Sequence, residues 1–72
     1  MGLQISLAAA RVNAKLTQEE VAKRLGVSKY TVGSWERGGT EPSVGRMMEL
    51  CKIYNVPLDC IILPKNLTLS GK

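Results

Sequence analysis

Histidine is absent from this chain of 72 residues, and with it the commonest general base and metal ligand. The two cysteines, Cys51 and Cys60, lack CxxC spacing, so a zinc site would need carboxylate ligands in an unusual geometry. Clustered carboxylates and a glycine-rich phosphate loop are missing as well. We therefore expect no enzyme, no metal or cofactor, and two buried, reduced thiols.

Phenylalanine is also missing, and the aromatic residues are Tyr30, Trp35 and Tyr54. The core of one small domain must then rely on aliphatic side chains. No uninterrupted apolar run approaches the length of a membrane span, and residues 1–4 lack the basic region of a signal peptide. These absences predict a cytoplasmic protein without a membrane segment.

Positive charge is what the chain has in excess: ten Lys and Arg face six Asp and Glu, for a formal net charge of +4. Such a balance favours a polyanionic partner but does not define a fold. Most of the excess lies in residues 1–40. Within this part, Lys23 and Arg24 are expected on a solvated helix face.

The first two helices are marked by spacing and by a cap. The first is predicted over residues 3–13 from apolar residues at helical spacing, Leu3, Leu7, Ala10 and Ala14. The second begins with a capping box, in which the Thr17 hydroxyl and the Glu20 carboxylate satisfy backbone N–H groups. It is expected to run to about Leu25.

The third helix follows a tight turn. Gly26 suits the turn because glycine adopts a positive φ cheaply, Ser28 is a good N-cap, and Gly38 and Gly39 end the helix. Gly33 inside this helix costs about 1 kcal/mol relative to Ala. Either another group approaches the backbone closely there, or the helix simply tolerates a weak residue.

The fourth helix is expected from the N-cap Ser43 to Tyr54, with Asn55 as its C-cap. Pro57 is predicted to open a fifth short helix whose buried face consists of Leu58, Ile61 and Ile62.

These helices predict one domain over residues 1–62 and a short tail over residues 63–72, either frayed or forming a small strand used in pairing. Trp35 and Met47 are expected in the core. Met48 is open between a core position and an adaptable partner surface.

Three segments carry a resemblance to a known family: LTQEEVAKRLGVSKYTVGSWERG, the EPS that follows, and NVPLD. They resemble the lambda-type repressor and Cro family of Xre-like helix-turn-helix domains, over roughly Leu3 to Ile62. The resemblance implies an all-α, five-helix lambda-repressor-like DNA-binding domain.

The resemblance also implies where double-stranded DNA is bound. Positions that read bases in the major groove correspond to Lys29, Tyr30 and Ser34. Positions that touch the phosphate backbone correspond to Gln18, Ser28, Thr31, Arg37 and Thr40. It further implies an ion pair between Arg11 and Glu36, which links the first helix to the end of the third.

The chain departs from the family on the outer face of the first helix, where charged residues are usual. Here that face is expected to carry Ile5, Ala8, Ala9 and Val12. Either it binds another copy or another protein, or its alanines only add helix propensity.

Together these features predict a transcriptional regulator of the phage or bacterial repressor type, binding an operator with two-fold-related half-sites as a homodimer. The alternative is a protein-interaction module, an antitoxin or a co-repressor subunit that uses the same fold with its apolar first-helix face.

Overall fold

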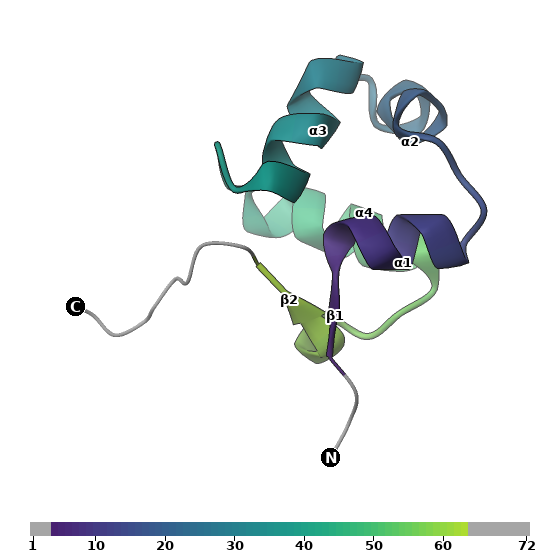
Figure 1. The fold of residues 1–72 in the computed structure, drawn as a ribbon, viewed down its shortest axis with the longest axis vertical. Helices are drawn as coiled ribbons and strands as arrows, with labels where there is room; N and C mark the ends of the chain where they lie inside the picture. The colour runs from purple at the N-terminus through teal and green to yellow at the C-terminus, as the bar shows by residue number, and fades with distance from the viewer. Residues whose placement is uncertain (1–3, 64–72) are drawn as a thin grey trace.

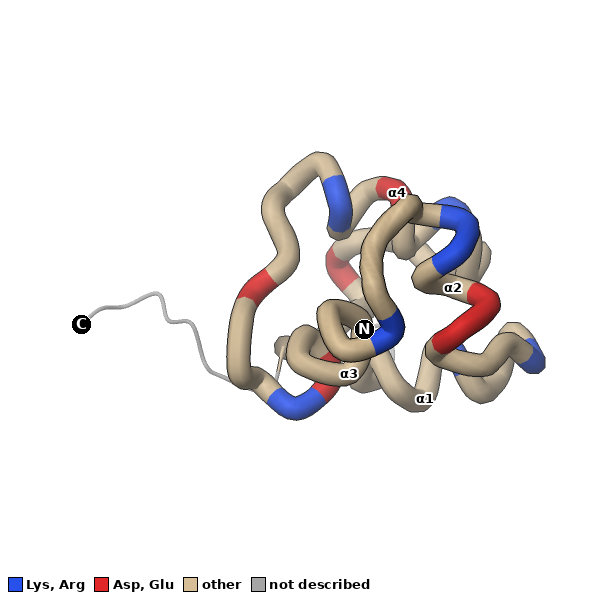
Figure 2. The backbone as a smooth tube through the Cα atoms, turned by 90° about the horizontal axis from the view of Figure 1, so that it is seen from above, with Lys and Arg blue, Asp and Glu red and all other residues tan. Residues whose placement is uncertain are grey.

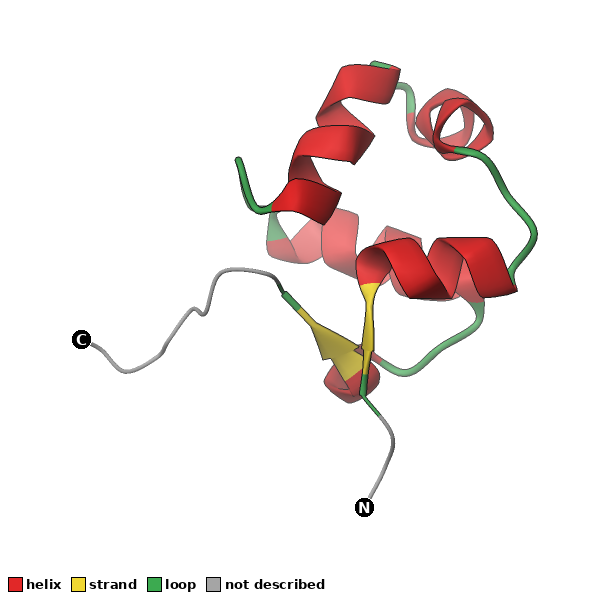
Figure 3. Ribbon diagram, viewed as in Figure 1, coloured by secondary structure: helices red, strands yellow, loops and turns green. Residues whose placement is uncertain are grey.

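The computed structural model describes residues 4–63, which form four α-helices, one 3-10 turn and one pair of short strands. In chain order these are β1 (Ile5–Ser6), α1 (Leu7–Asn13), α2 (Gln18–Leu25), α3 (Lys29–Arg37), α4 (Val44–Tyr54), the 3-10 turn η1 (Leu58–Cys60) and β2 (Ile61–Ile62) (Figure 1). Figure 3 shows the strand pair on the far side of α1 from α2 and α3.

Each α-helix begins at a hydroxyl N-cap that accepts a hydrogen bond from the backbone N–H three residues further along; these caps are Ser6, Thr17, Ser28 and Ser43. The Glu20 carboxylate in turn accepts from the Thr17 N–H at 2.8 Å, which confirms the capping box. Helices α2, α3 and α4 end at left-handed residues, Gly26, Gly38 and Asn55. The predicted bounds of these three helices are confirmed.

The prediction that the first helix starts at Leu3 is wrong. Helix α1 starts at Leu7, because the Ser6 hydroxyl caps the N–H of Ala9 at 3.0 Å. Ile5 and Ser6 are extended instead and pair in parallel with Ile61 and Ile62 of β2.

The fifth short helix predicted after Pro57 is confirmed only in part, as the 3-10 turn η1. Only the three residues of η1 are helical, and the backbone is extended again at Ile61 (φ −89°, ψ 133°), where β2 pairs with β1. Of its predicted buried face, Ile61 is partly buried against the core, whereas Leu58 and Ile62 are 48% and 43% exposed. Residues 4–63 are therefore mostly helical, with four α-helices and one pair of short strands, and the five-helix count is not confirmed. The predicted tail from residue 64 onward lies outside the described residues.

The core lies between the four helices. Its buried apolar residues are Leu7, Ala10, Val21, Ala22, Leu25, Val32, Trp35, Met47, Leu50, Cys51 and Tyr54. Trp35 and Met47 are thus confirmed as core residues, whereas Met48 is 57% exposed.

Both cysteines are free thiols; Cys51 is buried and Cys60 is partly buried. Burial raises the pKa of the Cys51 thiol, with a smaller contribution from Cys60, and this shift favours the protonated form of Cys51.

Across residues 4–63, no helix has the length and apolar content to span a membrane. Within the same range, no group of three or more Cys, Asp or Glu side chains is placed to hold a metal ion.

Candidate nucleic-acid interface

Helices α2 and α3 form a helix-turn-helix around Gly26, whose φ is 72°. Both helices bury one face against the core: Val21, Ala22 and Leu25 from α2, and Val32, Gly33 and Trp35 from α3. Other side chains of α3 face solvent, and Tyr30 is 79% exposed. Because Lys29 and Arg37 are its first and last residues, α3 carries a cation at each end (Figure 2).

An ion pair fixes α3 to α1, as the resemblance implied. Arg11 Nε donates to Glu36 Oε2 at 2.7 Å, and Arg11 Nη1 donates to the Leu16 carbonyl at 2.9 Å. The two charged side chains are only 16% and 7% exposed. The hydrogen bond that Arg11 donates to Glu36 raises the pKa of Arg11, so the guanidinium stays charged. The pair therefore anchors α3 to α1.

Gln18, the first residue of α2, joins this network. Its Nε2 donates to Glu36 Oε1 at 2.9 Å, while Arg11 Nη2 reaches the same oxygen at 3.3 Å. One of the two amide protons of Gln18 is thus committed to Glu36, and the other stays available to an acceptor outside the domain.

The structure answers the question that Gly33 left open. A β-carbon at this buried position would lie 3.1 Å from Arg37 Nη1 and 3.5 Å from the amide atoms of Gln18. The side chains of Gln18 and Arg37 therefore cross closely over the backbone of α3. Gln18 and Arg37 were each predicted to contact a DNA phosphate, and both side chains lie beside Gly33 in the structure.

At the start of α3, the Ser28 hydroxyl accepts the Thr31 N–H at 3.1 Å and lies 3.1 Å from the Thr31 hydroxyl. These two side chains stand beside Lys29 and Tyr30, at the positive end of the helix dipole.

At the end of α3, Thr40 Oγ1 donates to Ser34 Oγ at 3.0 Å. Ser34 and Thr40 were predicted to contact a base and a phosphate, respectively, and their contact with each other was not predicted. The only signal for it was the glycine pair at positions 38 and 39, which lets the chain turn back on the helix.

The apolar outer face expected on the first helix is smaller than predicted. Ile5 lies in β1 and packs against the core, so it does not belong to that face. Val12 is 61% exposed, Ala9 is exposed and Ala8 is partly buried. One exposed valine among alanines is an ordinary solvated surface.

The buried face and the exposed face of α3 define a helix-turn-helix domain of the DNA-binding kind, and a family model described as Helix-turn-helix (HTH_3) matches residues 7–59. The chain belongs to this Xre-like helix-turn-helix family. Its relatives include the cryptic phage CTXphi transcriptional repressor RstR of Vibrio cholerae, 42% identical over 62 residues that cover 86% of this chain and 56% of that protein.

Two further relatives agree. An uncharacterized HTH-type transcriptional regulator of Methanocaldococcus jannaschii is 38% identical over 48 residues, 67% of this chain and 73% of its own length. The HTH-type transcriptional regulator DicA of Escherichia coli is 42% identical over 43 residues, 60% of this chain and 32% of its own length. These names support a DNA-binding regulator rather than an enzyme.

The chain spans little more than half of RstR, 56% of its length. No solved structure matches the chain.

Proposed function

We propose that this chain is a sequence-specific transcriptional regulator of the repressor type that inserts α3 into the major groove of DNA. The observation that carries the proposal is the contrast between the two faces of α3. One face is locked by the core and by the Arg11–Glu36 pair, while the other presents polar side chains to solvent between two cations. A rigid helix with an exposed polar face suits the depth of the major groove.

Base reading falls to Lys29, Tyr30 and Ser34. The Lys29 ammonium is a donor suited to guanine O6 or N7, and the exposed Tyr30 offers a hydroxyl and an apolar ring that packs on a thymine methyl group. Ser34 offers a single hydroxyl, close to the end of α3.

Phosphate contacts fall to the side chains around this face. Arg37 supplies charge, and the free amide proton of Gln18 lies beside it above Gly33. Ser28 and Thr31 flank the N-terminus of α3, where an anion is favoured. Thr40 is the exception among the predicted phosphate contacts, because its hydroxyl proton is already donated to Ser34.

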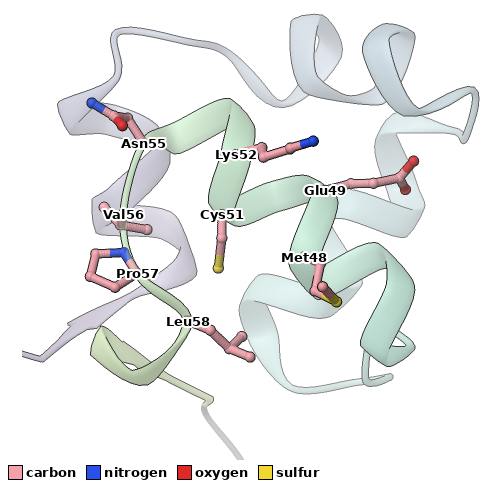
Figure 4. A pocket seen from close by; sticks show the side chains of 8 residues that line it. All are labelled: Met48, Glu49, Cys51, Lys52, Asn55, Val56, Pro57 and Leu58. Carbon is pink, nitrogen blue, oxygen red and sulfur yellow. The ribbon is translucent and has the colours of Figure 1, made fainter.

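We propose further that two copies bind together. A groove of about 600 Å³ runs along α4 and the segment after it (Figure 4). Met48 and Leu58 line it and are 57% and 48% exposed, and Glu49 and Lys52 add one charge of each sign. A two-fold-related copy presents the same surface, so Glu49 of each copy would face Lys52 of the other. Two α3 helices would then enter successive major grooves about 10 base pairs apart.

The bound protein would repress transcription by occluding a promoter. It would act in the cytoplasm, where bacterial and phage DNA lie. The alternative, an interaction module working through the first-helix face, loses support because Ile5 packs on the core instead of that face.

The test is a selection from random DNA duplexes at near-physiological salt. We expect the wild-type protein to enrich an inverted repeat, Lys29→Ala/Ser34→Ala to lose the preference at the base pairs that these two residues contact, and Met48→Glu to enrich single half-sites. Lys23→Ala, on the solvated face of α2, serves as the matched control and should enrich the same repeat. A folded wild-type protein that enriches no sequence would contradict the proposal.

A further inference from the structure

Thr40 and Ser34 form a hydroxyl pair that the family resemblance did not imply. Thr40 Oγ1 donates to Ser34 Oγ at 3.0 Å; Ser34 is a partly buried residue of α3, and Thr40 is exposed in the loop that follows the helix. We propose that Thr40 is a positioning residue that makes the Ser34 hydroxyl a hydrogen-bond donor to DNA, so that Ser34 selects a base with an acceptor edge. This inference rests on the proposed function of α3.

The backbone after α3 brings the two hydroxyls together. Gly38 is left-handed with φ 85°, and the Gly39 N–H donates to the Ser34 carbonyl at 2.9 Å. These bonds fold the loop back over the last turn of the helix. A β-carbon at position 39 would lie only 2.7 Å from Ser34 Oγ, so glycine leaves the space in which the Ser34 hydroxyl sits.

The number of protons and lone pairs on each hydroxyl determines whether it can donate a further hydrogen bond. A hydroxyl has one proton to donate and two lone pairs. The Thr40 proton goes to Ser34, so Thr40 has none left for a phosphate, which only accepts at neutral pH. Ser34 has one lone pair occupied and, among the described residues, no acceptor for its own proton. That proton is available to a base.

A donor discriminates among bases in the major groove. Guanine presents two acceptors, N7 and O6, whereas cytosine presents only the N4 amino donor. Adenine N7 and thymine O4 are acceptors as well, so Ser34 fixed as a donor disfavours cytosine at the base that it contacts. Without Thr40 the hydroxyl rotates freely and serves a donor or an acceptor edge equally well.

The experiment compares threonine-to-valine variants, which keep the shape and remove the hydroxyl. Binding is measured on the selected operator, on operators changed at each position, and on non-specific DNA. For Thr40→Val we expect unchanged non-specific affinity and a loss of preference of about three- to tenfold at one base pair, the size of one neutral hydrogen bond. Ser34→Ala should lose preference at the same base pair, and the double variant should lose no more than Ser34→Ala alone.

Two controls complete the design. Thr40→Ser keeps the hydroxyl and should retain the preference. Thr31→Val removes a hydroxyl proposed to contact phosphate and should weaken all sequences alike. Circular dichroism verifies that each variant is folded.

The proposal is overturned if Thr40→Val weakens every sequence equally, as a phosphate ligand would, if its effect adds to that of Ser34→Ala, or if it has no effect. Failure of the proposed function gives a different result, since the wild-type protein itself would then enrich no sequence.

Discussion

Arg11 Nε lies 2.7 Å from Glu36 Oε2, and this contact joins the helix that starts the domain to the helix proposed to read DNA. Glu36 also accepts from Gln18, so one carboxylate orients an arginine from α1 and a glutamine from α2. The second ion pair of the described residues, Arg46 with Glu49, lies on the surface, with side chains 36% and 52% exposed.

Arg11→Met should destabilise the domain by about 3 kcal/mol, because it leaves the shielded Glu36 carboxylate without its cation. Glu49→Ala is the matched control; its exposed pair is expected to contribute less than about 1 kcal/mol. Urea unfolding followed by circular dichroism measures both. Equal losses from the two variants would contradict the structural role given to Arg11.

Two glycines with open space around them should respond to alanine in opposite directions. Nothing lies within 4 Å of a β-carbon added at Gly45 or at Gly26, but Gly26 has a φ of +72°. Gly45→Ala should stabilise the domain by about 0.4–1 kcal/mol, because alanine favours the helix and restricts the unfolded chain. Gly26→Ala should destabilise it by about 1 kcal/mol or more, since alanine is strained at positive φ. Thermal unfolding gives both signs, and a stabilising Gly26→Ala would be inconsistent with the turn.

Tyr54 makes stability fall at alkaline pH. Burial, helped by the negative Glu36 and opposed by Arg11, raises the pKa of Tyr54 from 10.0 to about 12. Because the folded state favours the neutral phenol, this contribution is full below pH 10 and is lost as the pH rises from about 10 to about 12. A shift of this size corresponds to a contribution on the order of 2 kcal/mol.

The free energy of unfolding measured from pH 9 to pH 12 tests this. Tyr54→Phe should show a shallower decline than the wild-type protein, whereas Tyr30→Phe, at a tyrosine that is 79% exposed, should leave the decline unchanged. Parallel curves for Tyr54→Phe and the wild-type protein would rule out Tyr54 as the cause.

Alanine substitutions of Lys29 and Arg37 should change DNA binding in different ways. Lys29→Ala removes a base contact and should cost about 1–3 kcal/mol at its own base pair, relaxing the preferred sequence there. Arg37→Ala should weaken all sequences alike and reduce by about 1 the slope of log affinity against log salt. Fluorescence anisotropy at several salt concentrations separates them. Identical changes from the two substitutions would invalidate the assignment.

The middle of the fold was predictable from the sequence because its signals are local. Thr17, Ser28 and Ser43 cap helices within their own first turns, and Gly26 and Gly38 end them by conformations that glycine adopts cheaply. The first and last elements were not predictable, since Ile5 is extended only because Ile61 lies beside it. Such pairing joins distant segments and leaves little local signal.

The candidate site likewise has features that were predictable from the sequence and one that was not. The Arg11–Glu36 pair followed from family resemblance, and the exposed face of α3 followed from the spacing of Val32 and Trp35. The contact between Ser34 and Thr40 depends on how the loop folds back after Gly38, which composition does not reveal.

Amide chemical-shift mapping tests most directly whether α3 is the DNA-binding surface. The 15N-labelled protein is titrated with its selected duplex, and a scrambled duplex serves as the control. We expect the largest changes at Gln18 and from Lys29 to Thr40, with small changes on the outer face of α1. Changes concentrated on Val12 and its neighbours in α1, with α3 unaffected, would contradict the account.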